Sequence, residues 1–173
     1  MNFIIGDKVV YPNQGVGVIE KINTCNVFGI PQSFYQLKIV ANSLMVMVPV
    51  NNVADVGLRR LIKKEEVQKV LEYLKTKEVP HHTDWKNRFK ENSDKMRSGF
   101  IFEVADVLKS LALLSRSRTL SFREKKMLEK ARHLLITELS VVGNLGAEKV
   151  ELLVNNALLK FAEPEARALR VNA

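Results

Sequence analysis

The sequence has a single cysteine, Cys25, among its 173 residues. One thiol forms neither an internal disulfide nor a thiolate metal cage, so we expect an unbridged protein of the cytoplasm. The sequence also lacks an apolar run near the roughly 20 residues that span a bilayer. The densest apolar run begins at Leu44 and is interrupted by Pro49. No basic segment with a long apolar stretch opens the chain, so no signal peptide is expected.

The motifs of the common enzyme classes are missing as well. The sequence contains no G-x-x-x-x-G-K-[ST] phosphate loop and no G-x-S-x-G nucleophile elbow. Gly15-Val16-Gly17 lacks the third glycine of a dinucleotide fingerprint. Adjacent histidines, such as His81-His82, are more often solvated linker residues than metal ligands. We therefore expect no catalysis, no cofactor and no metal site.

Positive charge is in excess. Twenty-seven Lys and Arg residues stand against nineteen Asp and Glu, which gives a net charge of +8 and a pI near 9.6. Such a balance favours polyanionic partners, because cations beside phosphates release condensed counterions. The excess is modest and is greatest in residues 61–118, which carry thirteen basic and nine acidic side chains.

Residues 1–58 are typical of a small β module. β-branched and aromatic runs alternate with turn residues, and Phe34–Val40 has the period of two of a half-buried strand. Gly17, inside one run, indicates a bulge or a close backbone approach. The predicted strands span 8–11, 16–22, 34–40 and 44–48. Short strands at this spacing predict a small barrel or a strongly curved sheet.

Residues 59–163 are predicted to form five helices, which makes the fold class α+β. The second helix is expected from about Asp84, with Thr83 or Asp84 as N-cap, to a stop at Gly99. The fourth opens with the capping-box pattern Ser121-x-x-Glu124. Pro164 is expected to end the fifth helix and leave 164–173 as a frayed tail. Apolar residues recur at helical spacing at positions 67, 70, 71 and 74; 104, 107, 108, 111 and 114; 128, 131, 135 and 139; and 150, 153, 154, 157, 158 and 161.

The only tryptophan opens a segment rich in cations, Trp85-Lys86-Asn87-Arg88-Phe89-Lys90. A flat ring beside Lys and Arg is a natural nucleic-acid contact, because it can wedge against a base while the cations hold phosphates. Positions 85, 89 and 96 also fall on one helical face, so the ring can equally belong to a buried stripe. Spacing leaves both interpretations open, although a ring in the first turn can project from the end of a bundle.

Four segments resemble the bacterial CarD/CdnL family of transcription regulators. They are Gly6–Gly17 (GDKVVYPNQGVG), Val48-Pro49 with Val56–Arg59, Trp85–Lys90, and Leu120–Leu128 (LSFREKKML). The resemblance extends from Phe3 to about Phe161 in the family's order and spacing. The opening motif is shared with the polymerase-binding module of transcription-repair coupling factors. The tryptophan and the helical part separate this chain from those larger ATPases.

The resemblance implies a specific function. A Tudor-like or SH3-like barrel module binds the β subunit of RNA polymerase, and the helical domain contacts promoter DNA in the minor groove at the upstream edge of the bubble. The open promoter complex is thereby stabilised. Carried over by position, Trp85 is the wedge, and Arg88 and Lys90 are phosphate contacts in a DNA-binding segment that also contains Lys86. Val46, Met47 and Pro49 lie at the polymerase interface.

Some positions depart from the family pattern. Where some members carry arginine, this chain has Cys25, Met47 and Asn87. The polymerase contact is therefore expected to be more apolar, and the DNA contact is expected to have one phosphate contact fewer.

Two other functions stay open at this point. One is a stand-alone polymerase-binding module that recruits a protein through its helices without contacting DNA, and the other is an RNA-binding small-barrel protein. The leading interpretation is a monomeric, nucleoid-associated, non-enzymatic adaptor between polymerase and promoter, with a domain-swapped dimer as the other possible state.

Overall fold

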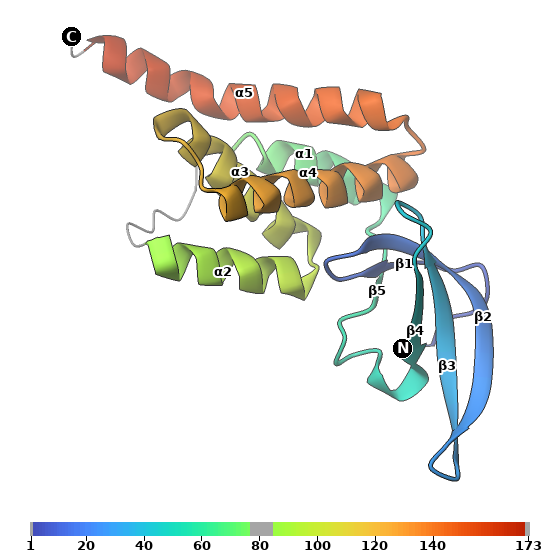
Figure 1. The fold of residues 1–173 in the computed structure, drawn as a ribbon. Helices are drawn as coiled ribbons and strands as arrows, with labels where there is room; N and C mark the ends of the chain where they lie inside the picture. Colours follow the sequence, from blue (N-terminus) through green and yellow to red (C-terminus); the bar gives the residue numbers. More distant parts are fainter. Residues whose placement is uncertain (1, 77–84, 172–173) are drawn as a thin grey trace. The chain divides into compact units, whose positions relative to one another are not determined.

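The computed structural model describes residues 2–76 and 85–171, with side chains for 2–76 and 87–160. The chain divides into two compact units, Met1–Leu61 and Ile62–Ala173. The first unit contains the strands and the second contains the helices (Figure 1). The α+β fold class is confirmed, as a Tudor-like β module and a helical bundle.

The first unit is a five-stranded antiparallel sheet with the order β4-β3-β2-β1-β5. Alternation sets its core, because Tyr35, Leu37 and Ile39 on β3 are buried while the residues between them are not. The elements are β1 (Lys8–Tyr11), β2 (Gly15–Val27), β3 (Ile30–Ile39), β4 (Met45–Pro49), the 3-10 turn Val50–Asn52 and β5 (Arg59–Arg60).

Gly17 is confirmed as a close backbone approach. A Cβ at this position would lie 3.2 Å from Ile39 Cδ1 and 3.3 Å from the backbone oxygen of Lys38. The irregularity in the β2–β3 register falls two residues later, between Ile19 and Lys21, so the bulge and the close approach occupy different positions.

The sheet exceeds the prediction in two places. The predicted strand 16–22 extends to Val27, so β2 and β3 form a long hairpin that turns at Phe28-Gly29. β5 was not predicted, because two adjacent arginines carry no strand pattern. Arg60 nevertheless pairs with Val9 of β1, and Leu61 belongs to the sheet unit, so the observed division lies three residues beyond the predicted boundary at 58.

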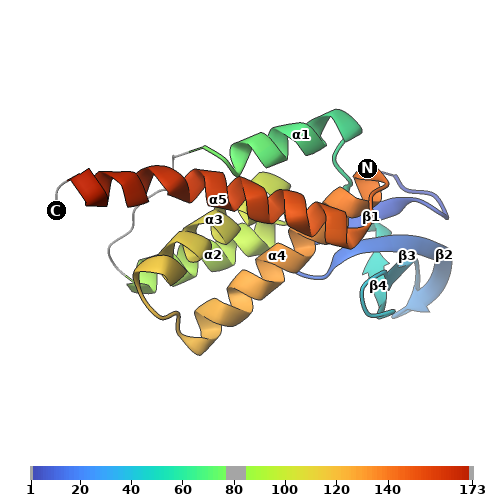
Figure 2. The same ribbon diagram turned by 90° about the horizontal axis from the view of Figure 1, so that it is seen from above.

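The described part of the second unit has five helices around one apolar core. Figure 2 shows α5 lying between α1 and α4 when the bundle is seen from above. The buried positions of α3 and α4 match the predicted stripes, among them Leu108, Leu111, Leu135 and Leu139. The helices are α1 (Lys64–Tyr73), α2 (Trp85–Ser98), α3 (Ile101–Ser117), α4 (Phe122–Gly143) and α5 (Ala147–Val171).

The helix ends agree with the sequence signals except at the C-terminus. Gly99 stops α2 with φ +72°, and Ser121 with Glu124 forms the capping box of α4. The expected N-cap of α2 lies outside the described residues. The expected end of α5 at Pro164 is wrong, because the helix continues to Val171. Proline removes one backbone hydrogen bond, and the residues around it, such as Ala162, Glu163, Ala166 and Leu169, are good helix formers that continue the helix.

Candidate functional site

The tryptophan-containing segment forms the first turns of α2. The backbone of Trp85 opens the helix, while the side chains of Trp85 and Lys86 lie outside the described ones. Farther along the segment, Asn87 and Lys90 are exposed and Phe89 is half-buried. Whether the indole ring is wedge or core therefore stays a prediction.

Lys90 has an exposed cationic companion that the sequence analysis did not single out. Arg97 lies seven residues beyond Lys90, on the same side of α2, and is also exposed. Lys95, between them, is engaged inside the bundle at 3.0 Å from Glu91 and 3.5 Å from Asp106. The seven-residue spacing was the signal that could have identified Arg97.

Arg88 has a different environment from Lys90. Only 15% of its side chain is exposed, and its Nη2 lies 3.5 Å from Oε1 of Glu124. The same oxygen accepts a hydrogen bond of 2.8 Å from Nη2 of Arg118. Two arginines from different segments therefore share one carboxylate at the start of α4. This contact ties the first turn of α2 to α4.

Glu124 is held as a carboxylate by its surroundings. Burial by itself raises the pKa of this carboxyl group, because it disfavours the charged form. Hydrogen bonds with the backbone and side chain of Ser121, and the hydrogen bond and charge of Arg118, outweigh burial and lower the pKa below its ordinary value of 4.5. The backbone N–H of Ser121 donates to Oε2 at 2.9 Å, and that of Glu124 donates to the Ser121 hydroxyl at 3.3 Å.

The predicted polymerase-binding residues lie on β4. Met47 is 52% exposed and Pro49 is half-buried on the same face. Val46 is also half-buried, but it pairs with the buried Leu37 and packs against the core, to which Val48 belongs. β4 ends the sheet order, so it pairs with β3 on one side only. An edge strand with unpaired backbone groups and an exposed methionine is suited to protein binding.

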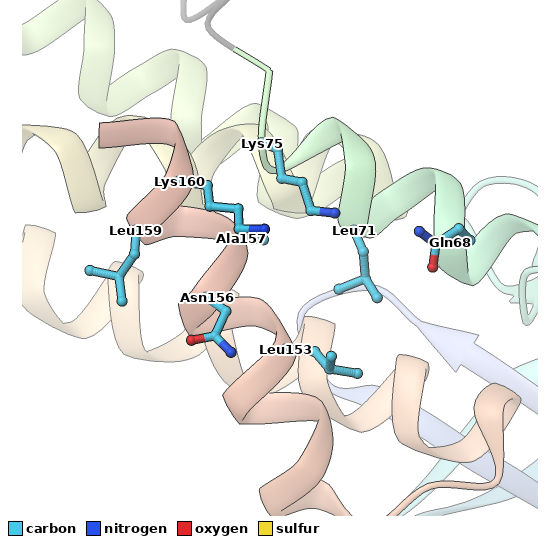
Figure 3. Close-up of a pocket in the computed structure, with 8 residues that line it drawn as sticks. All are labelled: Gln68, Leu71, Lys75, Leu153, Asn156, Ala157, Leu159 and Lys160. Atoms are coloured by element: carbon cyan, nitrogen blue, oxygen red, sulfur yellow. The ribbon is translucent and has the colours of Figure 1, made fainter. Parts of the chain in front are cut away.

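A groove of about 420 Å³ lies between α1 and α5 of the helical unit. Figure 3 shows that Lys75 and Lys160 come from opposite sides of it. Its eight lining residues include no hydroxyl, thiol, imidazole or carboxylate side chain, so its ionisable groups are the two lysine amines. They are Gln68, Leu71, Lys75, Leu153, Asn156, Ala157, Leu159 and Lys160.

Neither a cluster of metal ligands nor a membrane-spanning helix occurs in the part of the chain that the structure describes. Within it, three or more His, Cys, Asp or Glu side chains nowhere gather as metal ligands would. His81 and His82 lie outside that part. Among the described helices, none combines the length and the apolarity that a membrane span requires.

Comparison with known proteins gives matches to both units. The CarD C-terminal domain matches residues 69–155, and the CarD-like/TRCF RID domain matches residues 3–62. The chain is 30% identical over 149 residues to the putative transcription factor YdeB of Bacillus subtilis (strain 168). The aligned region covers 86% of this chain and 97% of YdeB. A solved structure, CdnLNt from Myxoccoccus xanthus, is 48% identical, covers 36% of this chain and 87% of its own, and has a TM-score of 0.31.

Proposed function

Because this chain belongs to the CarD/CdnL family of transcription regulators, we propose that it binds the RNA polymerase β subunit and stabilises the open promoter complex. The sheet unit binds polymerase, and the helical unit contacts promoter DNA in the minor groove at the upstream edge of the bubble. The observation that carries the proposal is the presence, in one chain, of a match to the CarD-like/TRCF RID domain and a match to the CarD C-terminal domain. The protein acts in the cytoplasm, on the nucleoid, as a monomer.

The polymerase contact is assigned to β4. Met47 is the exposed centre of the strand and Pro49 lies on the same face, whereas the side chain of Val46 packs against the core. The outer edge of β4 has no strand partner within the described sheet. Backbone hydrogen bonds along such an edge supply affinity, and the alternate side chains supply specificity. Methionine adapts to an irregular apolar surface, which suits a contact lacking the arginine of some relatives.

The DNA contact is assigned to the first half of α2. Trp85 is the wedge, and Lys86 and Lys90 contact phosphates, with the exposed Arg97 continuing the row. Arg88 has a second role, because its guanidinium group faces Glu124 inside the helical unit. It holds the first turn of α2, and with it the backbone of Trp85, against the start of α4.

A modest DNA affinity is sufficient for this function. Binding to polymerase raises the local concentration of the helical unit beside the promoter, so few phosphate contacts are needed. A ring at an unstacked junction binds melted DNA better than closed DNA and therefore shifts the equilibrium towards the open state. A difference of about 1.4 kcal/mol between the two states changes their ratio about tenfold.

The wedge is tested by Trp85→Ala in the full chain. The variant is expected to shorten the open-complex lifetime about tenfold on a promoter whose complex is short-lived, while polymerase binding is unchanged. The lifetime is measured by competitor challenge, and binding by pull-down of the β subunit. An unaltered lifetime contradicts the wedge assignment.

The polymerase contact is tested by Met47→Asp. A carboxylate placed on an apolar contact is left without a partner, so capture of the β subunit should be lost while the helical circular dichroism signal is retained. Ile5→Asp, which makes the same change of charge at an apolar residue that is 61% exposed ahead of β1, is the comparison variant. Full capture by Met47→Asp contradicts the β4 interface.

A second function is favoured by one observation, the groove between α1 and α5. Leu153 and Leu159 on its α5 side are exposed, and an apolar groove of this kind can receive a protein segment. The chain would then recruit another protein to polymerase without touching DNA. Footprinting separates the two functions, because only the DNA-contacting adaptor changes protection at the upstream edge of the bubble.

A further inference from the structure

The distal half of the sheet unit is almost free of charge. From Ile22 to Ala54, 33 residues that include the whole β2–β3 turn and β4, Lys38 is the single charged residue. The full chain is 27% charged. Depletion of charge together with exposed aromatic and methionine side chains distinguishes the centre of a protein interface from an ordinary surface.

The strand register connects β4 to the tip of this hairpin along one face. Pro49 pairs with Phe34, Gln32 with Cys25, and Ile30 with Val27. Directly paired residues point to the same side of a sheet, and every second residue along β3 does the same. Tyr35, Leu37 and Ile39 point to the core, so positions 30, 32, 34 and 36 point outward with Met47 and Pro49.

The distances along this face fit a single contact. Ile30 lies four residues before Phe34, which is roughly 13 Å at the rise of an extended strand. A protein interface of standard size buries about 800 Å² on each partner, a patch about 30 Å across. A partner that covers Met47 and Pro49 therefore reaches the tip of the hairpin without a second binding site.

Phe28, at the tip, is in a conformation that does not suit it. The two turn residues have positive φ angles, +51° at Phe28 and +82° at Gly29. Asn-Gly is the favoured pair for such a turn, and a bulky residue at positive φ is strained. The Phe28 side chain is fully exposed, so it contributes no burial energy to the folded chain that would offset this strain. A local rule broken without a folding benefit points to function.

We propose that Phe28 is an anchor that inserts into an uncharged apolar pocket on the polymerase surface bound by β4. The interface then runs from Met47 and Pro49, across Phe34, to Ile30 and Phe28. This inference rests on the proposed function, and it extends the polymerase contact from β4 to Phe28 in the β2–β3 turn. The partner surface is expected to lack charge opposite the tip, since the hairpin offers none from Ile22 to Leu37.

The variant Phe28→Asn separates binding from folding. Asparagine followed by glycine suits this turn, so the midpoint of thermal unfolding is expected to stay the same or to rise. Affinity for polymerase is expected to fall about tenfold or more, because a large aromatic side chain is no longer buried on binding. If Phe28 served only the structure of the turn, a variant that keeps or raises the thermal midpoint would also keep its affinity for polymerase.

Phe100→Asn is the matched control. Phe100 is also an exposed phenylalanine, and it is the N-cap of α3, where asparagine is likewise favoured. It lies in the helical unit, outside the proposed contact, so its variant should bind polymerase as the unchanged chain does. Affinities are measured with full chains and the polymerase holoenzyme by fluorescence anisotropy or biolayer interferometry, with Met47→Asp in the same series.

The outcomes are distinct. Loss of affinity in Phe28→Asn with retained stability, while Phe100→Asn binds normally, supports the anchor. Unchanged affinity in Phe28→Asn beside a weakened Met47→Asp overturns the anchor and leaves the polymerase contact standing. If the unchanged chain does not bind polymerase, both proposals fail. If Phe28→Asn changes only the oligomeric state, the tip joins copies of this chain and the anchor is overturned.

Discussion

Glu124 is the residue whose replacement most directly tests how α2 is held in place. The carboxylate is 10% exposed and faces Arg88 and Arg118 while it caps α4. Glu124→Gln keeps an oxygen that can accept the Ser121 N–H, so it removes the charge and spares most of the cap. A hydrogen bond to a charged group contributes about 1.5–3 kcal/mol, and we expect a loss of that size in the free energy of unfolding near neutral pH.

The pH dependence of this loss provides the sharper test. The pKa of folded Glu124 lies below its ordinary value of 4.5, so the carboxylate stabilises the fold fully above that value. As pH falls through the folded pKa, the contribution is lost. The difference in the free energy of unfolding between the wild-type chain and Glu124→Gln should therefore be largest near neutral pH and shrink towards zero in acid. The other carboxyl groups are the same in both chains, so their effects cancel in this difference.

The assay is urea unfolding followed by the helical circular dichroism signal, at a series of pH values from about 7 to about 3. Thermal midpoints of the helical transition should differ by roughly 5–15 °C near neutral pH. Glu129→Gln, an exposed carboxylate replaced on the same helix, is the control and should change stability by less than about 0.5 kcal/mol. A cycle with Arg88→Gln measures the coupling of the pair. A difference that is the same at every pH would refute the electrostatic account.

Three further predictions concern packing and charge. Lys109 is fully buried and its Nζ donates to the Tyr73 carbonyl and to the Thr76 hydroxyl, each at 3.1 Å. Lys109→Met should therefore destabilise the helical unit by about 1–3 kcal/mol in urea unfolding. A small loss, below about 0.5 kcal/mol, would mean that apolar packing replaces those bonds. Gly17→Ala places a Cβ within 3.3 Å of the Lys38 carbonyl and should destabilise the sheet unit by about 1–2 kcal/mol, and an unchanged thermal midpoint would contradict the close approach. Lys90→Gln should reduce the slope of the logarithm of the open-complex lifetime against the logarithm of the salt concentration by about 1. An unchanged slope would contradict a phosphate contact by Lys90.

Local signals in the sequence were sufficient for most of the secondary structure. The period of two in Phe34–Val40, the capping box at Ser121 and the stop at Gly99 each depend on residues close together in the chain. Local pattern misled at Pro164, where strong helix formers on both sides outweigh one missing backbone hydrogen bond. β5 has no local pattern, because its pairing with β1 depends on a partner about fifty residues away.

The residues of the candidate site likewise divide into those that the sequence indicated and those that only the tertiary structure revealed. The sequence alone determined the family, through motifs in order along the chain, and it placed Trp85, Lys90 and Met47 as contact candidates. Only the tertiary structure decided that Arg88 faces Glu124, since the two are 36 residues apart and no helical spacing relates them. It also decided that Phe28 stands fully exposed at a strained turn, on a face continuous with β4. Residue types and spacing follow from the chain itself, whereas which charges meet and which apolar groups stay uncovered depends on how distant segments pack.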